Sequence, residues 1–502
     1  MPAPRALARL LAPLLVAWPL IANAAEPDPL AGVKPCAPSG KGTDYQVGPG
    51  PGQLATLDDV PWERLGSGDT VRIFARPQPY RGKILVAGRG TPDAPVRVCG
   101  VRDDAGRRPV IDGNGAQARR GLAYGHPLHE ARSVVLVNRL GSQAWQAFPE
   151  NVVISGLHIR GAHPDNGFTD SKGQPQRYEK FGACVWIERG DGVTIADNEI
   201  SDCSQGIFSR STMDGDFAVT KRLRVAGNHL HDNGIAGSDR EHAAYVQSVD
   251  VVYEFNRFGR MRDGAGGNAI KDRSVGAVVR YNRIEDGARA IDLVEAEDYA
   301  DVARQDPRYR ETFVYGNVIV KDGRKGSTIH YGGDHAGSED NYRKGTLYFF
   351  HNTVRLTGDG YGVLFQLSTT QETAQVWNNV FLFDATIPHP RMRDGQDNAP
   401  GIESGGIVRL DRNWIVSRWS DAGPWHKVGG QLHGASRLLS GARPPVDAAT
   451  LKPIASSPLV GAGVVGPESA RLHEVKWQIG PRGEILPRNS SGNSGTLGAL
   501  EP

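Results

Sequence analysis

The chain has 502 residues, a formal net charge of +2, 63 glycines and only 4 methionines. This balance of charges argues against nonspecific nucleic-acid binding, which needs an excess of basic side chains. No segment approaches the roughly 20 consecutive apolar residues that a membrane-spanning helix needs, and the glycine-rich composition is typical of a turn-rich β protein.

The N-terminal residues have the pattern of an export signal. Arg5 and Arg9 precede an apolar stretch at 10–21, which is followed by the small-x-small sequence ANA at 22–24. We therefore expect residues 1–24 to be a signal peptide and the mature chain to be periplasmic or secreted. No cysteine directly follows the expected cleavage point, so a lipid anchor is not expected.

The four cysteines fit this expectation of export. In an exported chain, cysteines form disulfide bonds more often than metal sites. Cys36 and Cys99 lie in the N-terminal region, whereas Cys184 and Cys203 are 19 residues apart. We predict the pairs Cys36–Cys99 and Cys184–Cys203; free buried thiols are the alternative.

A repeated unit occupies the centre of the chain. Short runs of alternating apolar residues end in asparagine, as in VTIADNEI, LRVAGNHL and AVVRYNRI. The asparagines at this position are Asn198, Asn228, Asn256, Asn282, Asn317, Asn352 and Asn379. Each unit holds short strands and no amphipathic helix, so it can bury an apolar face only by stacking on its neighbours. We expect an asparagine ladder at one corner, since asparagine tolerates a left-handed backbone and its amide can bond to the next coil.

Parallel stacking of such coils predicts an all-β protein, a single-stranded right-handed parallel β-helix over residues 25–440. A propeller or a sandwich would need regular antiparallel hairpins, which the turn sequences do not provide. The proline- and glycine-rich residues 441–502 are expected to form a closing segment that covers the open end of the core. The polar insertions at 163–180, 297–311 and 383–400 are expected to be loops over one rim.

Aligning the strands that precede the asparagine runs gives three columns. The apolar column, expected to face the core, is Ile207, Ala244, Ile270, Ile291, Ile329 and Leu364. The next column, expected to face outward because strand side chains alternate, is Phe208, Tyr245, Lys271, Asp292, His330 and Phe365. A second outward column is Arg210, Gln247, Arg273, Val294, Gly332 and Leu367.

The outward columns place two cations, Lys271 and Arg273, on one strand face beside acid, imidazole and phenol groups from adjacent coils. A solvated charged face is the alternative interpretation, but such a face holds similar polar residues rather than one of each reactive kind. The alternation aims Asp272 inward, where a carboxylate needs hydrogen-bond partners.

The sequence GDTVRIFARPQPYRGKILVAGRGTPDAPVRVCG (68–100), the asparagine-ended coils and the Lys–Arg strand together resemble the β-helical polysaccharide lyases of the alginate lyase and chondroitinase B type. In that family a lysine on the helix face is the base, an arginine assists, and calcium often holds the substrate carboxylate. The resemblance implies that Lys271 is the base and that Arg273 or Arg289 is the arginine. Glu295 and Glu297 are the candidates for a Ca²⁺ site, with a solvated acidic loop as the alternative.

The implied reaction is β-elimination on an acidic, uronic-acid-containing polysaccharide. Arg273 can grip a carboxylate bidentately, and its charge is expected to lower the pKa of Lys271, an effect that Asp292 would oppose. Tyr245 or His330 is expected to protonate the leaving oxygen. The expected substrate-binding residues are Asp292, Gln247, Arg210, His242, Arg289 and Phe208. For His242 a structural role at a corner is the alternative.

Three other functions remain open from the sequence. A β-helical glycoside hydrolase would use paired carboxylates, such as Asp292 with Asp250 or Glu295. A C5-epimerase would invert the sugar without shortening the polymer. A non-catalytic carbohydrate-binding β-helix would use Phe208, Phe365 and Tyr245 as stacking surfaces.

Overall fold

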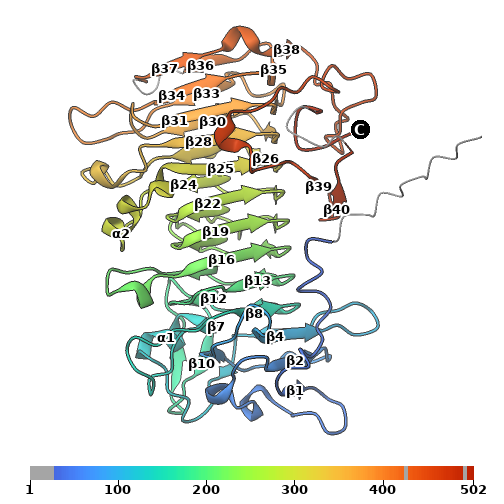
Figure 1. The fold of residues 1–502 in the computed structure, drawn as a ribbon, viewed down its shortest axis with the longest axis vertical. Helices are drawn as coiled ribbons and strands as arrows, with labels where there is room; N and C mark the ends of the chain where they lie inside the picture. The colour runs from blue at the N-terminus through green and yellow to red at the C-terminus, as the bar shows by residue number, and fades with distance from the viewer. Residues whose placement is uncertain (1–27, 423–427, 490–494) are drawn as a thin grey trace, which may run out of the picture.

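Three long parallel sheets form the body of the protein. The computed structural model describes residues 28–422, 428–489 and 495–502. Successive coils each add a strand to a 13-stranded sheet A and to two 11-stranded sheets, B and D. Figure 1 shows the coils stacked along the long axis of the molecule. The predicted parallel β-helix is confirmed, and its right-handed winding agrees with the general rule for parallel crossovers.

The strands have the following bounds. Sheet A holds β1 (Asp44–Val47), β2 (Thr70–Phe74), β4 (Val96–Val101), β8 (Val152–Ser155), β13 (Thr194–Ala196), β16 (Lys221–Ala226), β19 (Val249–Glu254), β22 (Val275–Arg280), β25 (Glu311–Tyr315), β28 (Thr346–Phe350), β31 (Thr373–Trp377), β34 (Ile407–Leu410) and β37 (Gln431–His433). Sheet B holds β5 (Val110–Asp112), β9 (His158–Arg160), β14 (Glu199–Ser201), β17 (His229–His231), β20 (Arg257–Phe258), β23 (Arg283–Ile284), β26 (Val318–Asp322), β29 (Thr353–Thr357), β32 (Val380–Phe383), β35 (Trp414–Val416) and β38 (Leu439–Gly441). Sheet D holds β3 (Ile84–Val86), β7 (Ser133–Val137), β12 (Ala183–Ile187), β15 (Gln205–Ser209), β18 (Ala244–Val246), β21 (Ile270–Asp272), β24 (Ile291–Leu293), β27 (Ile329–Tyr331), β30 (Val363–Leu367), β33 (Arg391–Asp394) and β36 (Ser420–Ala422).

The asparagine ladder forms at the corner between sheets A and B. Each backbone N–H donates to the side-chain Oδ1 of the asparagine one coil further on, at 2.8–3.0 Å. Each Nδ2 donates to the same Oδ1. The predicted ladder is confirmed, and Asn413 extends it by one coil. These amides fix the register of the coils.

The left-handed backbone at this corner lies one residue before each asparagine, not on the asparagine itself as expected. Phe255, Tyr281 and His351 have φ values of 57°, 56° and 50°. Gly227 and Gly316 hold the same position in other coils with φ of 66° and 67°. The asparagine is therefore selected for its amide rather than for a left-handed conformation.

The C-terminal residues lie along the flank of the helix rather than over its open end, which differs from the expectation for residues 441–502. Leu459 and Leu497 pack against Val380 and Trp414 of sheet B. Further along, the backbone N–H of Lys476 donates to the Tyr281 hydroxyl at 3.0 Å. Figure 1 shows this red segment descending beside the coils to the hairpin of β39 (Trp477–Ile479) and β40 (Ile485–Pro487). It therefore covers the asparagine corner.

The insertions contain some regular structure. Residues 163–180 include β10 (Gly167–Thr169) and β11 (Pro175–Arg177), which join β6 (Ala116–Gln117) in a small sheet C. Residues 297–311 include α2 (Ala300–Gln305) and the 3₁₀ helix η4 (Pro307–Arg310). The expectation of a loop at 383–400 is wrong in part, because β33 continues sheet D there. The other short helices are α1 (Pro127–Ala131), η1 (Leu57–Asp59), η2 (Trp62–Arg64), η3 (Asp216–Ala218), η5 (Glu339–Asn341), η6 (Ala435–Arg437) and η7 (Glu468–Ala470).

Both predicted disulfides are present. Cys36–Cys99 ties the N-terminal segment to β4, and Cys184–Cys203 links adjacent coils; the Cα atoms of each pair are 5.6 Å apart. The expected signal peptide, 1–24, lies outside the described residues. Among the helices that the structure describes, none combines the length and apolar character of a membrane span.

Replacing one rung of the ladder should destabilise the fold. In Asn282→Ala, the buried N–H of Asn256 loses its acceptor. One unsatisfied buried group costs about 1–3 kcal/mol, so we expect a loss of that size in the free energy of unfolding measured by urea denaturation. Asn114→Ala, at an exposed turn, is the matched control. Equal stability of the two variants would refute a structural role for the ladder.

Candidate active site

The outward column of sheet D has the predicted register up to its last member. Tyr245 pairs with Lys271, Lys271 with Asp292, and Asp292 with His330. His330 then pairs with Gln366, because Ile329 pairs with Phe365. The prediction is therefore wrong by one residue on β30: Phe365 lies in the core in place of Leu364, and the outward residue is Gln366.

Lys271 points away from the core, as predicted, but it is covered rather than exposed. Only 8% of the residue is accessible. Its Nζ lies 3.3 Å from Asp292 Oδ2 on the next coil and also bonds to Asp334 Oδ2. The ammonium group is therefore held between two carboxylates.

Arg273, two residues further on, is also enclosed. Its Nη2 donates to Asp334 Oδ1 at 3.0 Å and its Nη1 donates to Glu295 Oε2 at 3.1 Å. Its Nε donates to the Tyr245 hydroxyl at 2.9 Å. The sequence suggested a guanidinium that is free to bind a substrate carboxylate. In the structure it already binds carboxylates of the protein.

Asp334 is the acid that Lys271 and Arg273 share. It lies in the segment that follows β27, and its side chain is 22% exposed, more than either cation. Glu295 holds this segment down, because its carboxylate accepts the backbone N–H groups of Asp334 and His335, both at 3.0 Å. Asp334 therefore covers the two cations from the solvent side.

The electrostatics of this cluster differ from the expectation. Burial and Arg273 act to lower the pKa of Lys271, but Asp292 and Asp334 outweigh them and raise it. Burial acts to raise the pKa of Asp334, yet Lys271 and Arg273 hold it well below its usual range. In this arrangement the lysine is an ammonium and its partners are carboxylates.

Asp292 joins Lys271 to His330. Fully buried, Asp292 accepts a hydrogen bond from Asn268 Nδ2 at 2.7 Å, and its Oδ1 lies 2.7 Å from His330 Nδ1. The other ring nitrogen of His330 lies 2.7 Å from Gln396 Oε1. Burial acts to raise the pKa of Asp292, but Lys271, Arg289 and His330 hold it well below its usual range.

Aromatic side chains continue this column toward the N-terminal coils. Phe208 and Tyr245 meet edge to face, with ring centroids 5.2 Å apart. Tyr245 is partly exposed, and burial raises its pKa, so its hydroxyl keeps its proton. His242 is buried, and its Nδ1 accepts the backbone N–H of Asn268 at 2.9 Å. Burial and Lys271 lower the pKa of His242 to about 3, so it supports the Asn268 segment as a neutral ring.

The remaining predicted binding residues lie around the cluster. Arg289 Nη2 donates to Gln366 Oε1 at 3.1 Å, and its Nε is 3.9 Å from Asp292. Gln247 is buried and donates to Asp298 at 3.0 Å. Arg210 lies two coils before Arg273 and pairs with Glu188, so it belongs to another part of the same face.

Asp272 points inward, as the alternation predicted, and its partner is Arg343. Both side chains are fully buried, and Arg343 Nη2 lies 2.9 Å from Asp272 Oδ1. The Tyr253 hydroxyl donates to the second carboxylate oxygen at 2.9 Å. This pair closes the strand end directly beneath Lys271.

The expected metal residues do not form a calcium cradle. Glu295, Asp334 and His335 each offer one ligand atom within 4.8 Å of the others, whereas the predicted Glu297 is outside this group. Calcium prefers a shell of oxygen ligands, but one donor here is an imidazole. Arg273 already neutralises both carboxylates. We therefore derive no step through a bound cation.

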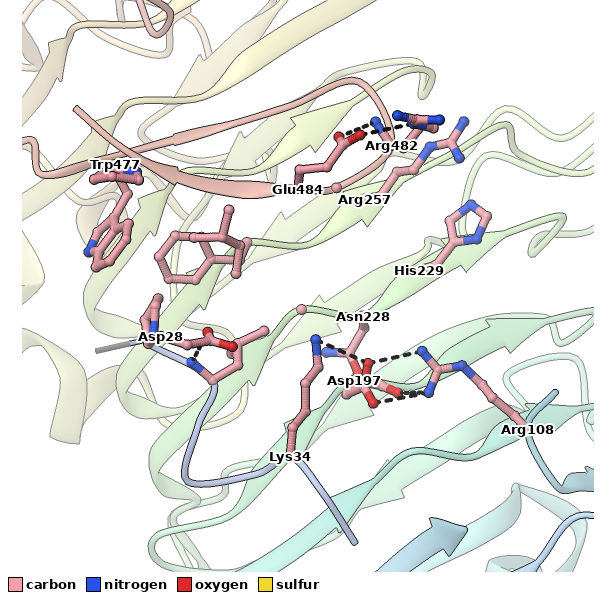
Figure 2. Close-up of a pocket in the computed structure, with 17 residues that line it drawn as sticks. Asp28, Lys34, Arg108, Asp197, Asn228, His229, Arg257, Trp477, Arg482 and Glu484 are labelled. Carbon is pink, nitrogen blue, oxygen red and sulfur yellow. Dashed lines mark hydrogen bonds and ion pairs between the residues drawn. The ribbon is translucent and has the colours of Figure 1, made fainter. Parts of the chain in front are cut away.

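A pocket of about 630 Å³ lies on the opposite flank of the helix (Figure 2). It is formed between sheet B, the N-terminal residues 28–34 and the C-terminal residues 477–487. Most of its charges are already paired within the protein. Asp197 lies 3.0 Å from Arg108 and 3.5 Å from Lys34, and Arg482 donates to Glu484 at 2.9 Å. This self-neutralised pocket presents no cluster comparable to that around Lys271.

Four residues of the site were missed from the sequence: Asp334, His335, Asn268 and Gln396. All lie in connecting segments outside the aligned strand columns. Asp334 and His335 follow two glycines in the sequence GGDH, which was a usable signal, because paired glycines permit a sharp turn that can bring polar residues back over a strand end.

Comparisons with known proteins give a distant likeness. No protein-family model and no curated protein sequence matches the chain. Pectate lyase Pel9A has a similar structure, with a TM-score of 0.42 and 10% identity over 87% of this chain and 89% of that chain. An alginate lyase from Paenibacillus sp. str. FPU-7 gives a TM-score of 0.34 at 12% identity, covering 75% of this chain and 94% of that one. The GH136 lacto-N-biosidase from Eubacterium ramulus gives a TM-score of 0.40 at 14% identity, covering 74% of this chain and 67% of that one. These values are too low to carry information on the reaction.

Breaking the buried pair beneath the site should cost much of the stability. Arg343→Met leaves Asp272 as an unpaired buried carboxylate, which costs about 3–5 kcal/mol. We expect a loss of that size in chemical denaturation. The double variant Asp272→Asn/Arg343→Met should recover part of it, since the buried charge is gone; a double variant as unstable as the single one would contradict this account.

Proposed function

We propose that the protein is an exported polysaccharide lyase that cleaves a uronic-acid-containing polysaccharide by β-elimination. One observation carries this proposal: Lys271 of β21 and Arg273, the residue after the end of that strand, converge on a single carboxylate, that of Asp334, at the solvent side of the sheet. A fork of two cations that fits a protein carboxylate also fits the carboxylate of a uronic acid.

Substrate binding replaces Asp334 with the carboxylate of the sugar. Arg273 then neutralises that carboxylate, which makes the neighbouring C5 proton more acidic. Lys271 Nζ, beside Arg273 on the same face, takes the C5 proton. The electron pair forms the C4–C5 double bond as the bond from C4 to the glycosidic oxygen breaks.

The exchange of carboxylates also prepares the base. In the free protein Asp292 and Asp334 together raise the pKa of Lys271. Moving Asp334 away removes one of these anions, and the sugar carboxylate that takes its place is neutralised by Arg273, whose charge continues to disfavour the ammonium form of Lys271. Substrate binding thus lowers the pKa of Lys271 and raises the fraction of the lysine that can accept the C5 proton.

Tyr245 supplies the proton for the leaving oxygen. Its hydroxyl accepts a hydrogen bond from Arg273 Nε at 2.9 Å, and its raised pKa keeps the proton on the ring oxygen until it is needed. This places a neutral donor one coil from Lys271, in the same column. His330, which is buried and held at both ring nitrogens, instead fixes the position of Asp292.

A glycoside hydrolase is the second candidate, favoured by one observation. Asp292 and Asp334 both contact Lys271 Nζ, so two carboxylates lie close together, as in retaining enzymes. A hydrolase, however, needs one protonated acid, and Lys271 keeps the pKa of both groups low. The lyase is therefore the better supported function.

Export is part of the proposal. Two disulfides fit an oxidising compartment, and the N-terminal sequence has the pattern of a signal peptide. Export also fits the proposed substrate, because an enzyme encounters large polysaccharides outside the cytoplasm.

The role of Lys271 is tested by removing its amine. Lys271→Met should lower the formation of unsaturated, ultraviolet-absorbing product from acidic polysaccharides by about 100-fold or more, the usual contribution of a general base. Lys271→Arg should also fail, because guanidinium stays protonated. Lys41→Met, at an exposed site, is the control, and a fully active Lys271→Met enzyme would end the lyase proposal.

The role of Asp334 is tested through the pH profile. Activity should rise with pH as Lys271 loses its proton. In Asp334→Asn one anion that raises the pKa of Lys271 is gone, so the rising limb should move to lower pH and KM should fall. Asp340→Asn, with a 98% exposed side chain, should leave the profile unchanged. An unmoved limb in Asp334→Asn would show that this acid does not control the lysine.

A further inference from the structure

A second cationic pocket opens on the same face of sheet D, on its N-terminal coils. The cavity is about 190 Å³ and its charged and aromatic walls come from Arg132, Arg139, Arg189, Arg210, Trp145 and Glu188. Glu188 is the only carboxylate among its described lining residues. Four guanidinium groups therefore face one acid.

The charges in this pocket are not balanced. Arg210 Nη1 lies 2.9 Å from Glu188 Oε1, and the His129 ring is 3.5 Å from the same carboxylate. Burial acts to raise the pKa of Glu188, but His129, Trp186 and Arg210 lower it to about 2. Among the described residues, the other three arginines form no ion pair with a carboxylate. The pocket thus carries an excess of positive charge.

Among the arginines of this pocket, Arg189 gives the clearest evidence for an anion site. Only 4% of the residue is exposed, and its Nη1 donates to the backbone oxygen of Trp145 at 2.8 Å. Its Nε is buried without a hydrogen-bond partner, as is Nε of Arg132. Burying a guanidinium without a paired counterion is costly, so an anion that enters the pocket would stabilise Arg189.

Aromatic rings hold these arginines in place. The guanidinium carbons of Arg139 and Arg189 lie 5.0 Å and 4.7 Å from the ring centroid of Trp145, and that of Arg132 lies 5.4 Å from Trp186. Such stacking fixes the planar group while leaving its edge free to donate. The donors are therefore preorganised.

The pocket is in line with Lys271. Glu188 and Arg189 follow β12, which is followed in sheet D by β15, β18 and β21. At about 4.8 Å between neighbouring strands, the pocket lies roughly 14 Å from Lys271, a span of several linked sugar rings. Between them the column holds Trp186 stacked on Phe208, with ring centroids 4.1 Å apart, and then Tyr245.

We propose that this pocket binds a carboxylate of the same polysaccharide chain, several sugars away from the bond cleaved at Lys271. The inference rests on the proposed function. It makes the enzyme favour long, regularly charged chains, because only a chain that spans both sites gains the second contact.

The test compares oligouronates from trisaccharide to octasaccharide, drawn from the polymer that the wild-type protein cleaves. In wild type, kcat/KM should rise steeply once the oligomer reaches the pocket. In Arg189→Gln, kcat/KM for the octasaccharide should fall by about tenfold or more, the effect of losing one charge-assisted hydrogen bond, and the steep rise should disappear. Arg139→Gln repeats the test if the first variant is unstable, and the exposed Arg409→Gln on sheet A is the control.

If Arg189→Gln lowers kcat/KM equally for the trisaccharide and the octasaccharide, or for neither, the proposal of a second site is wrong, while the lyase proposal still stands. If wild type cleaves no acidic polysaccharide, the proposed function fails, and calorimetry with oligogalacturonate octasaccharide still decides about the pocket. Weaker binding of this octasaccharide by Arg189→Gln than by Arg409→Gln supports a carboxylate site in the pocket. Equal binding by the two variants, or binding only of sulfated oligosaccharides, overturns this site.

Discussion

The register between coils is the constraint on which the rest of this structure depends. The asparagine amides bond each coil to the next with N–H to Oδ1 distances of 2.8–3.0 Å. A strand that slipped by one residue would turn its core side chains to solvent. With the register fixed, Lys271, Asp292 and His330 must stand in one outward column, about 4.8 Å apart from coil to coil.

On this rigid sheet, the reaction that we propose begins with an exchange of counterions at Lys271 and Arg273. Two cations that would repel each other are held together because they share Asp334 and because Glu295 and Asp292 flank them. The acid that covers the cations belongs to a connecting segment, whereas Lys271 lies on β21 and Arg273 directly follows it. In the proposed mechanism a substrate carboxylate can therefore take the place of the acid without disturbing the sheet.

The sequence was sufficient to predict most of the features that depend on the repeat. The fold, the ladder and the outward positions of Lys271, Asp292 and His330 follow from periodicity, because a stacked repeat turns spacing into contact. Both disulfides were predicted from the export pattern and from the positions of the four cysteines along the chain. The prediction failed by one residue at Phe365, where the strand alignment allowed two registers. It also failed for residues 441–502, whose weak pattern does not reveal which surface they cover.

The chemistry of the site was less predictable than its position. Asp334 comes from a segment with no repeat, so its approach to Lys271 depends on how the chain turns after β27. Without it, the sequence suggested a lowered pKa for Lys271, whereas two carboxylates raise it. The sign of a pKa shift depends on every neighbouring charge, and the columns supplied only some of them.

The mass balance of a cleavage reaction tests the central claim most directly. A defined oligouronate should be cleaved once per molecule, early in the reaction, and the masses of all products determined by mass spectrometry. For β-elimination, the masses of two fragments add up to the mass of the substrate, and one fragment carries a C4–C5 double bond. Fragments that together weigh one water molecule more than the substrate would show hydrolysis and contradict the account.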